Sequence, residues 1–115
     1  MQLENFSYPN DQYCTLGKNT WSVDRLIQLS KDFKVFKIPV DGLNVYTKYD
    51  ITLRQLVAHI KAVQKADLKF PIILDEDGEI LDGRHRIMKA ILEGKSYVLA
   101  VRFGLNPTPC KREED

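Results

Sequence analysis

The sequence predicts an α+β fold, a small domain in which helices pack on a short mixed sheet. Two observations support this prediction. In residues 70–103 the hydrophobic period changes from that of strands to that of a helix and back again. In residues 52–65 apolar side chains recur with the spacing of one helix face. Strands and helices therefore alternate along a chain of 115 residues, which is long enough to bury a core of its own.

Residues 70–81 are predicted to form a β-hairpin. The apolar run at 70–74 has the length and composition of a buried strand. The acidic segment that follows ends at Gly78 and is typical of a tight turn, because Asp and Gly tolerate the backbone angles that such turns need. Residues 79–81 then return as the second arm of the hairpin.

A helix and a further strand are predicted to follow the hairpin. Four apolar residues fall on one helix face, namely Ile87, Met88, Ile91 and Leu92. Gly94 is a natural helix stop, and residues 97–103 again have the composition of a strand. The junction between the hairpin and this helix is the segment Asp82-Gly83-Arg84-His85-Arg86.

The rest of the chain is predicted to flank this block. We expect an N-terminal arm and a short helix at 1–32, a central domain at 33–104, and a flexible tail at 105–115 with too little apolar content to pack. Alternating apolar residues predict a strand at 33–40. The helix at 52–65 carries a clean apolar stripe made of Leu53, Leu56, Val57, Ile60 and Val63.

Composition limits the classes of function. Seventeen basic against sixteen acidic residues leave a net charge of +1, so no global basic field drives nonspecific binding to nucleic acid. No apolar run reaches the ~18 residues that a membrane span needs, and no signal peptide is visible. We therefore expect a cytoplasmic protein without a membrane partner. Cys14 and Cys110 lack a CxxC pattern, which favours reduced thiols and no metal centre.

The strand-to-helix junction has the chemistry of an anion site. A helix N-terminus presents N–H groups without partners and a partial positive charge. Gly83 allows a ligand to approach the backbone closely, and Arg84, His85 and Arg86 add donors around the same point. The same residues also fit a plain capped helix with Asp82 as its N-cap, so both interpretations are open.

A resemblance favours the first interpretation. The segment Gly83-Arg84-His85-Arg86 follows PIILDEDGEILD and precedes a helix that contains Ala90. It is similar to the G-x-H-R or G-E-R-R motif of the ParB/sulfiredoxin superfamily, which lies at this strand-to-helix turn and holds nucleotide phosphates. The resemblance covers about residues 35–103 and implies the ParB/sulfiredoxin-like fold. Arg84 occupies the position of sulfiredoxin's reactive cysteine, so sulfinic-acid reduction is not expected.

The same resemblance extends the expected site to the helix at 52–65. Thr52, Gln55 and His59 share a polar face and match positions at which the sulfiredoxin helix contacts ATP phosphates, although the residue types differ. The loop after the strand at 33–40, with Tyr46 and Tyr49, is a further candidate for ligand contacts, and packing of these tyrosines explains them equally well.

The sequence-based hypothesis is therefore a nucleotide-binding domain. The nucleotide is ATP or CTP, with or without Mg²⁺, and turnover would be NTP hydrolysis or phosphoryl transfer. The phosphate-binding candidates are Thr52, Gln55, His59, Gly83, Arg84, His85 and Arg86. The catalytic candidates are Asp82 and His85, with Asp75 and Asp41 as further carboxylates near the inferred cleft. The alternatives are a DNA- or protein-binding module of ParB-like type and a ParB-like nuclease.

Overall fold

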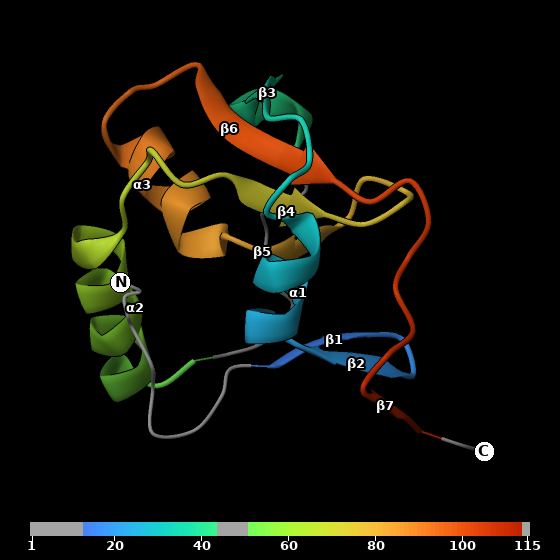
Figure 1. Ribbon diagram of the computed structural model, residues 1–115. Helices are drawn as coiled ribbons and strands as arrows, with labels where there is room; N and C mark the ends of the chain where they lie inside the picture. The colour runs from blue at the N-terminus through green and yellow to red at the C-terminus, as the bar shows by residue number, and fades with distance from the viewer. Residues whose placement is uncertain (1–12, 44–50, 114–115) are drawn as a thin grey trace.

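Two small sheets and the helices around them build the protein (Figure 1). The computed structural model describes residues 13–43 and 51–113. The larger sheet has the strand order β3-β6-β4-β5, made of Phe36–Pro39, Tyr97–Arg102, Ile72–Leu74 and Ile80–Asp82. The smaller sheet has the order β1-β2-β7, made of Tyr13–Leu16, Asn19–Ser22 and Lys111–Arg112. The predicted α+β class is confirmed.

The larger sheet is mixed, as predicted. Strands β4 and β5 form the expected antiparallel hairpin, while β6 runs parallel to β4 and antiparallel to β3. The hairpin turn is closed by the N–H of Asp75, which donates to the Glu79 carbonyl at 2.9 Å. Gly78 has a φ of 84° there, as the turn composition predicted.

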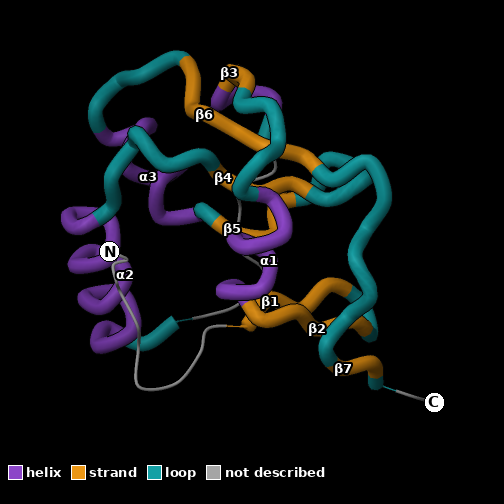
Figure 2. Tube along the Cα trace, viewed as in Figure 1, coloured by secondary structure: helices purple, strands orange, loops and turns teal. Residues whose placement is uncertain are grey.

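Helices cover both faces of this sheet. On one face α3 (Arg84–Leu92) buries Ile87 and Ala90 in a cluster with Ile72 and Leu74 of β4. On the other face β2 and α1 (Val23–Ser30) contribute Trp21 and Leu26 to a second cluster. Side chains alternate between the two clusters along the strands, so β4 is apolar and buried throughout. In Figure 2, α1 lies between the two sheets, and it contacts β2 and β4.

Helix α2 (Leu53–Lys65) forms where predicted but does not reach the core. An apolar helix stripe ordinarily faces a core, yet in α2 Val63 is buried while the other four members of the stripe are exposed. The reason is that α2 packs on the outer side of α3, so α3 stands between it and the sheet (Figure 1).

The C-terminal segment differs from the flexible tail that we expected. Strand β7 pairs with β2, and the indole nitrogen of Trp21 donates to the Pro107 carbonyl at 2.9 Å. The N–H of Asn106 donates to the Glu76 carboxylate at 3.0 Å, and Glu76 donates its own N–H back to Asn106 at 2.8 Å. Backbone and polar pairing therefore hold this segment without an apolar run, which is why composition did not predict it.

The N-terminal arm also contains more regular structure than we expected. Residues 13–22 form the hairpin β1–β2, whose turn includes Gly17 at a φ of 59°. Trp21 is buried and Tyr13 is exposed, so Trp21 alone of these two attaches the arm to the body. Tyr8 lies outside the described residues.

We predict that Gly83→Ala destabilises the fold by about 3 kcal/mol. An added Cβ would lie 2.5 Å from Cγ2 of Ile72, and the φ of 112° is itself unfavourable for alanine. Gly78→Ala is the matched control, because Gly78 has a positive φ but nothing within 4 Å of the added Cβ, and it should cost only about 1 kcal/mol. Urea denaturation of both variants measures the difference, and equal losses would show that the contact with Ile72 is unimportant.

Candidate functional site

The α3 N-terminus is built differently from those of α1 and α2. Ser22 caps α1 by accepting the N–H of Arg25, and Thr52 caps α2 by accepting the N–H of Gln55. In α3 the N-cap is Gly83, which has left-handed backbone angles and provides no side-chain hydrogen bond. Gly83 itself therefore offers the first turn of α3 no side-chain cap, a feature that suits anion binding at a helix start.

The glycine at this position is imposed by β4. Strand β5 ends at Asp82 and the chain turns into α3 against Ile72, so a Cβ at Gly83 would also lie 2.8 Å from the Ile72 Cβ. A larger residue would have to push the helix start away from the sheet. Gly83 was predicted to allow a ligand to approach the backbone closely, and in the structure the group that lies close to it is Ile72 of β4.

Two histidines meet beside this helix start. Nδ1 of His59 in α2 and Nε2 of His85 in α3 are 2.8 Å apart, a hydrogen bond that leaves the other nitrogen of each ring outside the pair. Burial lowers the pKa of His85 below its usual 6.5, and the nearby His59 lowers it further. His85 is therefore neutral at pH 7 and can both donate and accept a proton at its two nitrogens.

Asp82 and Arg86 are engaged with each other. The Arg86 guanidinium lies 2.9 Å from Oδ2 of Asp82, with the two side chains only 20% and 16% exposed. Arg86 also donates to the Pro71 carbonyl at 2.5 Å. Asp82 is therefore not the N-cap of α3, and its carboxylate is neutralised rather than available as a base. Arg86 joins α3 to the start of β4, a structural role that the sequence motif did not predict.

Lys89, which follows the two arginines along α3, is also engaged. Its ammonium donates to the carbonyl of Ala66 at 2.6 Å and to that of Gln64 at 3.4 Å, at the C-terminal end of α2. A cation at a helix C-terminus stabilises the helix dipole. Arg84, at the first position of α3, is the exposed member of this basic cluster.

Thr52 and Gln55 serve as helix caps. The Thr52 hydroxyl accepts the N–H of Gln55 at 3.1 Å, and the Gln55 amide oxygen accepts the N–H of Thr52 at 2.8 Å. This capping box explains both residues without a ligand. The described contacts bring only His59 of the predicted polar face to the Gly83 turn. Tyr46 and Tyr49 lie outside the described residues.

The other predicted carboxylates are not gathered at the site. Asp75 is buried in the hairpin turn, where its Oδ1 accepts the N–H groups of Asp77 and Glu79, each at 2.8 Å. Asp41 is exposed in the short 3₁₀ turn η1 (Val40–Gly42). Residues 13–43 and 51–113 contain no group of three or more His, Cys, Asp or Glu side chains that could hold a metal ion.

Cys14 is a neighbour of the site that no local sequence pattern indicates. Strand β1 packs against β5 and places Cys14 close enough to Asp82 and Arg84 for their charges to act on the thiol. Burial, followed by the Asp82 charge, raises the pKa of Cys14 to about 11. The thiol is therefore protonated at pH 7 and a poor nucleophile.

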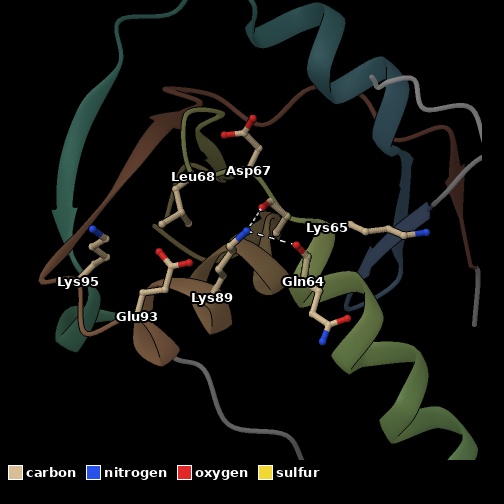
Figure 3. A pocket seen from close by; sticks show the side chains of 8 residues that line it. Gln64, Lys65, Asp67, Leu68, Lys89, Glu93 and Lys95 are labelled. Atoms are coloured by element: carbon tan, nitrogen blue, oxygen red, sulfur yellow. Dashed lines mark hydrogen bonds between the residues drawn. The ribbon is translucent and has the colours of Figure 1, made fainter.

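An open hollow of about 530 Å³ lies elsewhere, at the C-terminal ends of α2 and α3 (Figure 3). Lys89 points across it to the end of α2, with Asp67, Glu93 and Lys95 around it. Neither the Gly83 turn nor the two histidines line this hollow. It is therefore separate from the site that the sequence predicted.

Comparison with family models, with curated proteins and with solved structures gives no match for this chain. None of the helices in the described ranges is long and apolar enough to cross a membrane.

We predict that His85 titrates below pH 6.5 in the folded protein. Between its folded pKa and 6.5 the unfolded chain binds the proton more readily, so the free energy of unfolding should fall as the pH is lowered through this window. In His59→Gln the pKa of His85 should rise but stay below 6.5, because burial is the larger cause. NMR titration of the ring protons measures both values, and a wild-type pKa at or above 6.5 would contradict the geometry.

We predict that the two thiols differ in reactivity. The exposed Cys110 accepts hydrogen bonds from the Ser22 N–H at 3.4 Å and from Arg25 at 3.7 Å, which lower its pKa. Iodoacetamide at pH 7 should therefore alkylate Cys110 about 100-fold or more faster than Cys14, since two pKa units separate Cys14 from an ordinary thiol. Peptide mass spectrometry follows both rates, and equal rates would refute the burial of Cys14.

Proposed function

We propose that this protein binds a nucleotide, ATP or CTP, by holding its phosphates at the N-terminus of α3. The observation that carries the proposal is the absence of a side-chain cap at Gly83, in contrast with the capped starts of α1 and α2. The similarity of this turn to the phosphate motif of the ParB/sulfiredoxin superfamily supports the same function. A phosphate oxygen would accept the first-turn N–H groups in place of the missing cap.

The charges around the turn suit an anion. Arg84 lies at the first position of α3 and can form two charge-assisted hydrogen bonds to a phosphate. Asp82 lies next to the turn, but its charge is compensated by Arg86 at 2.9 Å, so it opposes an anion only weakly. The dipole of α3 adds a further favourable term.

The histidine pair adds polar ring nitrogens beside the phosphates. The hydrogen bond between His59 and His85 fixes both rings, and each keeps one nitrogen for a ligand. Of the polar face of α2, His59 is the described member that reaches the turn, because Thr52 and Gln55 are hydrogen-bonded to each other in the capping box.

Turnover at this site would be phosphoryl transfer, to water or to another acceptor. Positioning and charge neutralisation supply most of the catalysis in such reactions. His85, neutral at pH 7, is better suited than the ion-paired Asp82 to accept a proton from the attacking group. Mg²⁺ would arrive with the phosphates, since the described residues contain no preformed cluster for it.

Binding of nucleic acid, including nuclease activity, is the weaker alternative. It would need several cations aimed at successive phosphates. Arg86 and Lys89 are hydrogen-bonded within the protein, and the net charge of the chain is only +1. We therefore expect a small, compact polyanion to bind better than duplex DNA.

We predict that Arg84→Ala weakens nucleotide binding by about 1.5–3 kcal/mol, the usual contribution of a hydrogen bond to a charged group. Titration calorimetry with ATP and with CTP, each with and without Mg²⁺, measures the affinity. Arg112→Ala is the control, because Arg112 is an exposed arginine in β7. Equal affinities for the wild type and both variants would refute the site.

The same titrations against duplex DNA at several salt concentrations separate the alternatives. A phosphate site for a free nucleotide should leave DNA binding weak, with a shallow slope of log K against log salt. Tight DNA binding with a steep slope, together with no heat from either nucleotide, would overturn the proposal.

A further inference from the structure

Helix α2 presents an apolar stripe to solvent, which we call the α2 stripe and define as Leu53, Leu56, Val57 and Ile60. These side chains are 81%, 41%, 49% and 47% exposed, respectively. They follow one another at the spacing of a single helix face over two turns. Solvent exposure of four large aliphatic side chains on one face is costly for a protein that acts alone, and such patches mark interaction sites.

A basic row runs beside the α2 stripe. Arg54, Lys61 and Lys65 are exposed and lie at spacings of seven and four residues, which places them on one flank of the helix. Residues 51–66 include no aspartate or glutamate. Within the described ranges none of these three cations is in an ion pair. The other flank carries His59, which contacts α3.

We infer that the α2 stripe is a docking surface for an amphipathic helix of a partner protein, with aliphatic side chains on one face and acidic residues along one edge. The apolar face of such a helix would pack on the stripe as two helices pack ridge into groove. Its acidic edge would meet Arg54, Lys61 and Lys65 and fix the orientation. The inference does not depend on nucleotide binding, because the stripe and the basic row lie on other faces of α2 than His59.

Charge favours this occupant over the other two candidates. A second copy of the chain would bring one basic row against another across a symmetric helix pair, since the helix has no acidic residue to offer in exchange. An anionic membrane would attract the same charges. However, membrane-surface helices commonly place Trp or Phe beside Leu on the apolar face, and α2 contains Leu but neither Trp nor Phe.

The test uses a synthetic helical peptide of about 18 residues, with leucines at the spacing i, i+3, i+4, i+7 and glutamates on one edge. Titration into ¹⁵N-labelled full-length protein, followed by NMR, should shift amides of α2 from Leu53 to Lys65. Affinity should fall at least about tenfold in Leu56→Gln/Val57→Gln and in Arg54→Glu/Lys61→Glu. Leu105→Gln is the matched control, because Leu105 is 79% exposed outside α2, and this variant should bind as the wild type does.

Three results would overturn the inference. A peptide with lysines in place of the glutamates would bind as tightly as the glutamate peptide, or Leu105→Gln would weaken binding as much as the α2 variants do. The third result is that no α2 amide shifts at millimolar peptide. Sedimentation that shows a dimer dissolved by Leu56→Gln/Val57→Gln would assign the stripe to a second copy. Binding of phosphatidylserine vesicles through α2 without binding of the peptide would assign it to a membrane. Circular dichroism of every variant confirms that the fold is kept.

Discussion

The structure of the candidate site depends on the contact between Gly83 and Ile72. Strand β5 must end and α3 must begin directly against β4, where even a methyl group would overlap with Ile72. This contact fixes a glycine as the N-cap, and a glycine has no side chain with which to cap a helix. The requirement for close packing against the sheet therefore places, at the same position, a helix start whose N-cap has no side chain and whose first N–H groups are the donors of the proposed anion site.

The side-chain contacts next to this turn hold the start of α3 in place and are not themselves part of the proposed anion site. Arg86 connects the first turn of α3 to Asp82 and to the chain before β4, and Lys89 connects the second turn to the end of α2. The Lys89 contact helps to fix the position of α2, from which His59 reaches His85. Arg86 and Lys89 thus have structural roles. In the proposed site, the contacts to phosphate come from the backbone, from Arg84 and from the histidine pair.

Sequence reasoning predicted the features that depend on local patterns. The hairpin, the helices at 52–65 and after Gly83, and the strand at 97–103 follow from hydrophobic period and turn residues, and the structure has them all. The sequence did not show which ion pairs and hydrogen bonds the charged side chains form. Lys89 bonds to residues distant in sequence, and Arg86 and Asp82 pair across one helix turn. The packing of residues 106–113 and the position of Cys14 depend on long-range strand pairing, for which the composition of either segment carries no signal. The exposure of the α2 stripe could not be predicted for the same reason. Periodicity shows that a helix has an apolar face, but it does not show what packs against that face.

Amide chemical shifts of the three helix starts show directly whether phosphate binds at the N-terminus of α3. The full-length protein, labelled with ¹⁵N, would be titrated with inorganic triphosphate and with ATP. We expect the amides of Arg84, His85 and Arg86 to shift with saturation. Those of Asp24 and Arg25 in α1 and of Arg54 and Gln55 in α2 should move little, because side chains already cap those helices. Shifts of equal size at all three helix starts, or none at α3, would contradict this expectation.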